Sequence, residues 1–518
     1  MNLEKLADVV TPLEPHQQRV ADKLKASKGL LVAHGLGSGK TLSSIHAAES
    51  LGLPIEAIVP APLIKNYEKE LKKHLDHPRD ARIRSYEKAV RDKDINPNAL
   101  VVLDEAHRAR NMNTAIAQEI ARRAATAKAR LLLTGTPIYN SPTDLASLLN
   151  TAAGKEIVPG NPSEFKQKYI GHENIPVPLL TRLKGHLIGK PIQPATQKTL
   201  INRQKLIDAA KGYVDVHSGQ GEDFPSVQEE LHQVPMSPKQ WEMYHFHEGK
   251  LPWPIQTKIH YGLPLSKAES KDLNPFQAAL RQVSNTPRPY IRDMTDEQEL
   301  DQTPKIQKMV EHLQEMRAKD PQHRGVLYSN FLEGGLQPLS RALTQSNIPH
   351  SLFTGDIGPR ERNRMVEEYN QGKTPVMLLS GAGSEGLDLK GTRSIQLMEP
   401  HWNEARLKQV IGRGVRYRSH AHLPSEAQNV KVMRYHATPP NTLWSRIGKA
   451  VGSPASKSID QYLHGLSQSK QELANQIGDA LQEASDYGPL QTKAREKAAA
   501  DYRLSSESLK MIFERTNA

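Results

Sequence analysis

Two stretches of this chain alternate short apolar runs with amphipathic patterns. In the N-terminal third, apolar runs lie at 30–33, 57–60, 100–103 and 131–133, and helical patterns at 63–75 and 115–127 separate some of them. Strands that alternate with helices are typical of a parallel sheet covered by helices on both faces. We therefore expect residues 1–155 to form a doubly wound α/β lobe.

A second alternating block begins near Gly325. Its apolar runs lie at 326–328, 351–353, 376–379, 395–398 and 430–435, with a helical pattern at 360–370. Residues 304–440 are therefore expected to form a second lobe of the same α/β class. These two similar halves are the closest approach to an internal repeat, since no solenoid-type period is found.

Two regions lack this alternation. Residues 156–303 have poor periodicity and many Pro, Gly, Gln and Lys residues, which favours helical insertions and linkers. The tail, residues 441–518, mixes charges nearly evenly and predicts polar helices. These helices either pack against the second lobe or bind a protein partner.

Composition excludes several classes of protein. The 518 residues are too many for one core and include no cysteine, so disulfides and thiolate metal sites or nucleophiles are excluded. No apolar run approaches the ~20 residues of a membrane span, and the first residues lack the apolar core of a signal peptide. We expect a monomer that binds no membrane, in the cytoplasm of a bacterial or virus-infected cell or packaged in a virion.

The charge favours a polyanionic partner. The formal net charge is +12, and aromatic residues make up only 5% of the chain, which indicates contact with a phosphate backbone rather than base stacking. From Ile175 to Ile207 there is no acidic residue. Six basic residues in that stretch either grip phosphates or belong to a solvated loop: Arg182, Lys184, Lys190, Lys198, Arg203 and Lys205.

The first apolar run leads directly into a glycine-rich turn that ends in Lys40 and Thr41. Glycines allow positive φ angles, so successive N–H groups can point at a phosphate, and the following helix adds its positive end. Lys40 would reach the β- and γ-phosphates, and the Thr41 hydroxyl would hold Mg²⁺. The alternative is an ordinary strand–turn–helix corner, and His34 stands where the first glycine of the motif is usual. The candidate nucleotide-binding residues are His34, Gly35, Gly37, Ser38, Gly39, Lys40 and Thr41.

A pair of carboxylates follows the apolar run at 100–103. Asp104 and Glu105 would lie at the end of a buried parallel strand, where open α/β sheets bind ligands. Asp104 would hold Mg²⁺, and Glu105 would orient or deprotonate the attacking water. The alternative is a solvated acidic helix start. Following a phosphate-binding loop in this order, the pair favours ATP hydrolysis with Mg²⁺ held by Thr41 and Asp104.

The second block carries two arginines near its end. Arg413 and Arg416 are three residues apart, so on a helix they would share one face and could hold the triphosphate in its transition state. Alternatively, they bind nucleic-acid phosphate or only solvent. Upstream, a glycine-rich loop with Gly386 and Asp388 either lines a cleft between the blocks or is an ordinary loop.

Taken together, these motifs resemble superfamily 2 helicase-type translocases, closest to the Swi/Snf-like branch and to poxvirus and large-DNA-virus nucleoside triphosphatases. The resemblance runs from Leu13 to His436. The segments that carry it are 13–17, 59–71, 104–111, 133–140 and 280–287, and Gln17 lies in the first of them. The sequence at 417–435 is more similar to the viral members.

The resemblance implies two RecA-like lobes with ATP and Mg²⁺ between them and nucleic acid across both. Gln17 would read the adenine, while Lys40, Asp104, Glu105, Arg413 and Arg416 would be catalytic. The function it implies is ATP-driven, sequence-nonspecific translocation on DNA, chiefly double-stranded, that remodels DNA or protein–DNA complexes. A strand-separating or branch-migrating helicase is the alternative within the enzyme class. An ATP-gated structural binding protein is the alternative outside it.

Overall fold

A computed structural model of the chain describes residues 11–35, 37–76, 80–92, 94–109, 114–138, 141–175, 195–217, 224–291, 293–381, 387–440 and 456–486. The chain divides into two compact units. The first unit comprises residues 1–171, 200–219 and 473–518, and the second comprises residues 172–199 and 220–472.

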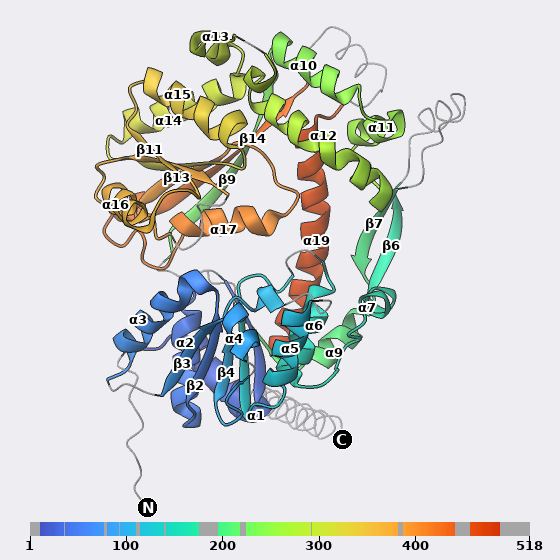
Figure 1. The fold of residues 1–518 in the computed structure, drawn as a ribbon, viewed down its shortest axis with the longest axis vertical. Coiled ribbons are helices and arrows are strands. Elements are labelled where there is room, and N and C mark those ends of the chain that lie inside the picture. The colour runs from blue at the N-terminus through green and yellow to red at the C-terminus, as the bar shows by residue number, and fades with distance from the viewer. Residues whose placement is uncertain are drawn as a thin grey trace, which may run out of the picture. The chain divides into compact units, whose positions relative to one another are not determined.

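The first unit is built on a parallel sheet of six strands in the order β3-β2-β4-β5-β1-β8 (Figure 1). Strands β1, β4 and β5 are completely buried because both faces of the sheet are covered. The strands are β1 (Gly29–His34), β2 (Ile55–Val59), β3 (Ala81–Ser85), β4 (Leu100–Leu103), β5 (Ala129–Thr134) and β8 (Val214–His217).

Two separate apolar clusters cover the two faces of this sheet. One contains Val20 and Leu24 of the first helix, and the other contains Ile120 and Leu148 from helices later in the chain. The helices of this unit are α1 (Pro15–Ser27), α2 (Lys40–Leu51), α3 (Ile64–His74), α4 (Tyr86–Asp92), α5 (Ala115–Ala124), α6 (Asp144–Ala153), α7 (Pro162–Tyr169) and α9 (Arg203–Ala210).

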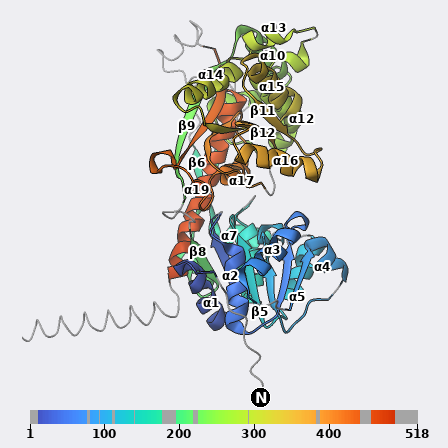
Figure 2. The same cartoon turned by 90° about the vertical axis from the view of Figure 1, so that its left-hand side faces the viewer.

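The second unit has a parallel sheet of the same size, in the order β11-β12-β10-β13-β14-β9. Its faces are also covered by two apolar clusters. The strands are β9 (Ser226–Pro235), β10 (Arg324–Ser329), β11 (His350–Phe353), β12 (Val376–Ser380), β13 (Thr392–Leu397) and β14 (Asn429–Thr438). The helices of this lobe are α14 (Pro304–Lys319), α15 (Gln337–Gln345), α16 (Pro359–Asn370) and α17 (Glu404–Gly414) (Figure 2). The prediction of two doubly wound α/β lobes is confirmed.

The region 156–303 is not only helical, which corrects the expectation of helical insertions and linkers. It contributes β8 to the first sheet and β9 to the second, and β6 (Ile170–Ile175) and β7 (Ala195–Leu200) form a two-stranded sheet. Its other helices are α10 (Pro238–Glu248), α11 (Trp253–Tyr261), α12 (Lys267–Asn285) and α13 (Asp296–Asp301). Part of the basic stretch, residues 176–194, lies outside the described residues.

Strand β9 has no apolar run because it lies at the exposed edge of the sheet, where its backbone pairs with β14. Most of its residues are exposed. Glu229 pairs with Arg434 at 3.0 Å, and Glu230 pairs with Lys431 at 2.9 Å, both across the parallel register with β14. A search for apolar runs therefore misses this strand.

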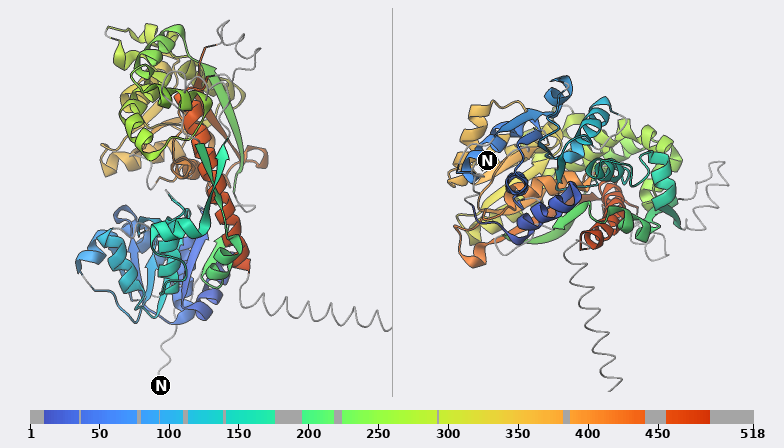
Figure 3. Two further views of the ribbon diagram at one scale, coloured as in Figure 1. Left: turned by 90° about the vertical axis from the view of Figure 1, so that its right-hand side faces the viewer. Right: turned by 90° about the horizontal axis from the view of Figure 1, so that it is seen from below.

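The described part of the C-terminal tail is one long helix, α19 (Ile459–Asp486), visible as an unbroken rod in Figure 3. Ile459 and Tyr462 lie in an apolar cluster of the second unit, whereas Ile477 and Leu481 lie in the core of the first. Packing against the second lobe, as expected, is thus correct only for the first turns. In the described parts of the chain, no helix combines the length and the apolar character that a membrane crossing requires.

Removing a buried side chain from the end of α19 should destabilise the first unit. Leu481 is 1% exposed, so we expect Leu481→Ala to lower the free energy of unfolding by about 2–4 kcal/mol. Urea titration followed by circular dichroism measures this change, with Gln482→Ala at the exposed next position as the control. Equal stability of the two variants would contradict the placement of this helix in the core.

Candidate active site

The loop after β1 has the backbone geometry of an anion cradle. Gly37 and Gly39 adopt φ angles of 78° and 72°, and Gly39 directly precedes the twelve-residue helix α2. A Cβ atom on Gly39 would lie 2.3 Å from Nε2 of Gln17, and the positive φ angle is strained for any residue other than glycine. The loop therefore combines glycines at positive φ with the positive end of a helix, as a phosphate site requires. Leu36 lies outside the described residues.

Lys40 extends across this loop. Its Nζ donates to the carbonyl oxygens of His34 at 3.1 Å and Gly35 at 3.0 Å. The Ser38 hydroxyl donates to the same Gly35 carbonyl at 2.8 Å. The ammonium group is thus held over the loop whose N–H groups would face a phosphate, and Thr41 follows it in the first turn of α2.

The start of α1 contacts the middle of the loop. The Gln17 amide donates to the carbonyl oxygen of Ser38 at 3.2 Å and accepts from the N–H of Glu14 at 3.0 Å. A ring nitrogen of His16 lies 2.8 Å from the same Ser38 oxygen. Gln17 is therefore at the phosphate loop, while its contact with adenine stays a prediction.

Asp104 lies buried at the end of β4. Its N–H donates to Ile58 at 2.9 Å, and one carboxylate oxygen accepts from the N–H of Glu105 at 3.0 Å. Burial and then the Glu105 charge raise the pKa of Asp104 to about 6, although the Lys40 charge acts in the opposite direction. That effect means that the Lys40 ammonium and the Asp104 carboxylate share one site.

Glu105 occupies a left-handed backbone conformation, with φ of 50°. Its carboxylate lies 3.3 Å from Nδ1 of His107, and this nitrogen is 3.5 Å from the hydroxyl of Thr134 at the end of β5. The strain of a non-glycine residue at positive φ is typical of functional positions. The acidic pair is thus connected to the strand end that carries the 133–140 segment.

These donors fit a hydrated divalent cation. A carboxylate and a hydroxyl are oxygen ligands of the kind that Mg²⁺ takes together with phosphate oxygens and water. The buried Asp104 carboxylate is costly to ionise, and a cation would remove that cost. Thr41 and Asp104 would hold the metal, which would neutralise phosphate charge.

The predicted arginines belong to the second unit. Arg413 is in the last turn of α17, but Arg416 lies beyond Gly414, where the helix ends. The expectation that both share one helical face is therefore wrong: Arg416 begins a turn in which its N–H donates to the Ser419 hydroxyl at 3.2 Å. A Cβ on Gly414 would lie 2.9 Å from Thr392, which shows how closely the helix end packs.

The loop between β12 and β13 is linked to these arginines. Asp388 lies 3.5 Å from the Arg416 guanidinium, and the Arg413 carbonyl accepts from Leu389 at 3.2 Å. Gly386 lies outside the described residues. These contacts bring Asp388, Arg413 and Arg416 together on the second unit.

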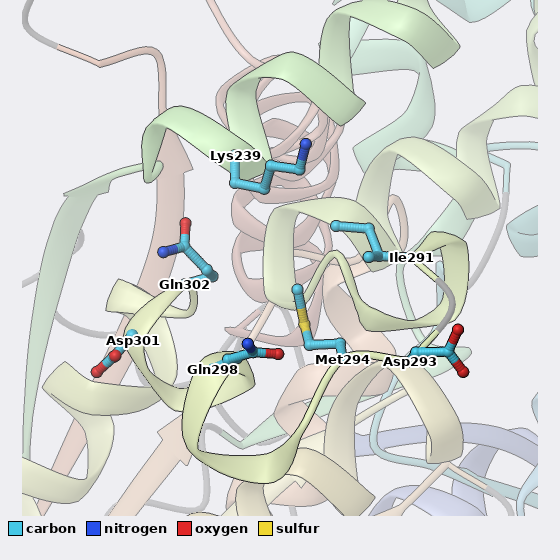
Figure 4. Close-up of a pocket in the computed structure, with 7 residues that line it drawn as sticks. All are labelled: Lys239, Ile291, Asp293, Met294, Gln298, Asp301 and Gln302. Carbon is cyan, nitrogen blue, oxygen red and sulfur yellow. The ribbon is translucent and has the colours of Figure 1, made fainter.

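A surface hollow of about 310 Å³ also belongs to the second unit (Figure 4). None of the predicted site residues lines it, and it contains no glycine-rich loop, so it is not the nucleotide site. It is lined by Lys239, Ile291, Asp293, Met294, Gln298, Asp301 and Gln302.

The sequence analysis missed three residues that contact the phosphate loop or its supports. His16 contacts Ser38, His217 stacks on His16, and Asp215 contacts His34. The available signal was an aspartate between the apolar residues Val214 and Val216, because a charge in a buried strand needs a partner.

Family comparisons match two consecutive segments of the chain. Residues 63–289 match the SNF2-related domain, and residues 304–418 match the helicase conserved C-terminal domain. The two matches correspond to the segments that carry the acidic pair and the arginines.

Individual relatives are viral. The chain is 30% identical over 486 residues to an Acanthamoeba polyphaga mimivirus protein named as an ATP-dependent RNA helicase, covering 91% of this chain and 97% of that protein. It is 24% identical to the termination factor NPH-I homolog of African swine fever virus, covering 89% and 76% respectively. Among solved structures, the helicase domain of Pyrococcus furiosus Hef is similar in fold, with a TM-score of 0.50, 15% identity, and coverage of 83% and 96%.

Replacing Asp104 by Asn should stabilise the protein when nucleotide and metal are withheld. Because the pKa of Asp104 is raised from 3.8 to about 6, stability is lost as the pH rises through this window and the carboxylate ionises in the fold. We expect Asp104→Asn to raise the free energy of unfolding by on the order of 2–3 kcal/mol at pH 8, and by little at pH 4.

Urea titrations in chelator at the two pH values measure this difference. The control is Asp80→Asn, at an exposed position of the same unit. If Asp104→Asn raises the free energy of unfolding equally at both pH values, the raised pKa of Asp104 is not the cause, and the prediction is wrong.

Proposed function

Because the chain belongs to the SNF2-related family of ATP-dependent helicases, we propose that it hydrolyses ATP to move along duplex DNA and to remodel DNA or protein–DNA complexes. One observation carries the proposal: the glycine-rich loop with Lys40 follows β1 and the buried Asp104 follows β4, so both lie at the carboxyl edge of one parallel sheet. In open α/β sheets this edge is where ligands bind.

The predicted catalytic and metal-binding residues of the first unit each have a defined role in this proposal. Lys40 leaves its two carbonyl partners and binds the β- and γ-phosphates. Thr41 and Asp104 hold Mg²⁺, and the ionised form of Asp104 is the one that binds it. Glu105 orients the attacking water and accepts its proton.

The second lobe supplies positive charge to the transferred phosphate. We assign this role to Arg413 and Arg416, as the family resemblance implies, with Gly386 and Asp388 in the adjoining loop. Arginine suits it because its planar charge matches an equatorial phosphoryl group. Binding and release of the γ-phosphate would then bias a two-state movement of the lobes.

The nucleic acid is the least constrained part of the proposal. The match to the SNF2-related domain favours translocation on double-stranded DNA through phosphate contacts, with weak sequence preference. The name of the mimivirus relative supports RNA as a second candidate substrate. We further propose that the protein acts as a monomer in the cytoplasm of an infected or bacterial cell or in a virion, and that the C-terminal tail, residues 441–518, is the segment through which a protein partner binds.

The ATPase rate should depend on nucleic acid and on Lys40. We expect duplex DNA to stimulate phosphate release more than single-stranded DNA, forked DNA or RNA, and Lys40→Ala to abolish the stimulated rate because it removes the phosphate-binding ammonium. Malachite-green assays with the four nucleic acids in parallel test this, beside strand displacement on the fork. Lys25→Ala, at an exposed position of α1, is the matched control.

A Glu105→Gln protein should bind ATP and hydrolyse it very slowly. Normal turnover in that variant would reassign the base, and strongest stimulation by RNA would favour the second candidate substrate. ATP binding with turnover that no nucleic acid stimulates would instead favour the ATP-gated structural protein.

Binding to DNA should weaken steeply with salt, because phosphate contacts release counterions. Lys65, an exposed residue at the start of α3 in the 59–71 segment, is expected to contact phosphate. Lys65→Ala should reduce the slope of log K against log salt by about 1, while Lys88→Ala on α4 leaves it unchanged. Fluorescence anisotropy over a salt series measures the slope, and a salt-independent affinity would contradict backbone recognition.

A further inference from the structure

Strand β8 pairs in parallel with β1, the strand that leads into the phosphate loop. Between β5 and β8 the chain forms α6, α7, β6, β7 and α9. In the parallel register Val32 is opposite Asp215, and His34 is opposite His217. The N–H of Gly35, the first loop residue, donates to the His217 carbonyl at 2.8 Å. The edge strand is thus in direct contact with the start of the loop.

Asp215 is fully buried and is surrounded by cationic or ring N–H groups. Its Oδ1 lies 2.7 Å from Nε of Arg19 and 2.6 Å from Nζ of Lys23, and its Oδ2 lies 2.7 Å from Nε2 of His34. Burying a carboxylate is costly unless it is paired and hydrogen-bonded. This carboxylate satisfies that requirement with three partners from α1 and β1.

The charges of this cluster are well defined. Burial acts to raise the pKa of Asp215, but hydrogen bonds from His34 and Arg19 and the charge of Lys23 hold it below its usual range. Burial lowers the pKa of His34, which favours the neutral ring. A neutral ring beside a carboxylate donates its Nε2–H to Oδ2, which fixes the orientation of the imidazole.

The cluster reaches the phosphate loop at two points. At the loop's start, the His34 carbonyl accepts from Lys40, so the placement of His34 determines where the ammonium rests. At the loop's middle, Ser38 is contacted by His16 and Gln17, which belong to the same helix as Arg19 and Lys23.

Ring contacts among His16, His34 and His217 also belong to the cluster. His16 stacks on His217, with ring centroids 3.9 Å apart and planes 10° apart. Its edge also meets His34 at 5.4 Å. Asp215 therefore connects β8, α1 and β1 around the loop.

We propose that Asp215 is a positioning residue of the nucleotide site, which fixes the start of the phosphate loop through His34 and its middle through α1. The proposal rests on the proposed ATPase function. A loop held in its binding conformation loses less freedom when nucleotide binds, so its affinity is higher. Without the carboxylate, Arg19 and Lys23 repel each other, and both supports of the loop are released.

The test is Asp215→Asn, which keeps the side-chain shape but removes the charge. We expect the Kd for a fluorescent ADP analogue and the KM for ATP to rise about tenfold, with kcat at saturating ATP within about threefold of wild type. Titration of the full-length protein gives Kd, and steady-state assays give KM and kcat separately.

Two control variants separate positioning from stability. Val214→Ala shortens a side chain of the same strand that packs in the apolar core, and it keeps the backbone carbonyl that accepts from Lys23. Asp208→Asn removes an exposed carboxylate on α9. Both should bind ADP as wild type does. A rise in Kd for Val214→Ala equal to that for Asp215→Asn, at matched Tm, would overturn the proposal, as would wild-type Kd in Asp215→Asn. Absence of nucleotide binding in the wild-type protein would refute the proposed ATPase function instead.

A double-mutant cycle tests the route through His34. If Asp215 acts through this ring, Asp215→Asn should weaken ADP binding much less in a His34→Ala background than in the wild type. Equal losses in both backgrounds would show that the two residues act independently and would overturn the proposal.

Discussion

A carboxylate buried at a parallel sheet needs a cation, and the first unit meets this need in two opposite ways. Asp215 has its cations within the chain, and its pKa is held low. Asp104 is buried with a second carboxylate beside it, and its pKa is raised to about 6. One carboxylate is thus permanently satisfied and serves as a fixed support. The other is left electrostatically strained, which suits a group that must bind a metal during each cycle.

The two carboxylates lie in the same sheet as the phosphate loop and act on it from different sides. Asp104 shares its site with Lys40, whereas Asp215 contacts His34, whose carbonyl holds Lys40 in place. The ammonium group is therefore near a carboxylate that is costly to ionise, and it is bonded to the carbonyl of His34, whose ring pairs with Asp215. A phosphate group entering the loop would compete for the ammonium with two backbone carbonyls, which are weak partners compared with a charged oxygen.

The parts of the fold that the sequence predicted are those in which local patterns and packing agree. The apolar runs at 30–33, 100–103 and 131–133 became fully buried strands because both faces of a parallel sheet are covered. Strand β9 was missed because it is an exposed edge strand that pairs with β14, and β8 because it has four residues and one is a charged Asp. Such partners are distant in sequence, so no local pattern reveals them.

In the candidate site, too, features set by local motifs were predictable and features set by distant contacts were not. The phosphate loop and the acidic pair follow motifs whose chemistry is local, and their geometry was predictable from spacing. The position of Arg416 was not, because where α17 ends depends on the close packing of Gly414 against Thr392. The contacts of His16, His34 and Asp215 were also inaccessible, since a separation of 181 residues between His34 and Asp215 carries no local signal.

The placement of α19 has a consequence for how the protein is made. Lys23 donates to the carbonyl of Ser485 across a separation of 462 residues, and Leu481 completes a core that begins at the first strand. On the ribosome, the first lobe therefore emerges early but stays unfinished until almost the whole polypeptide has been synthesised. During that interval its apolar surface is exposed, so this nascent chain should depend on chaperones longer than a lobe that closes its own core.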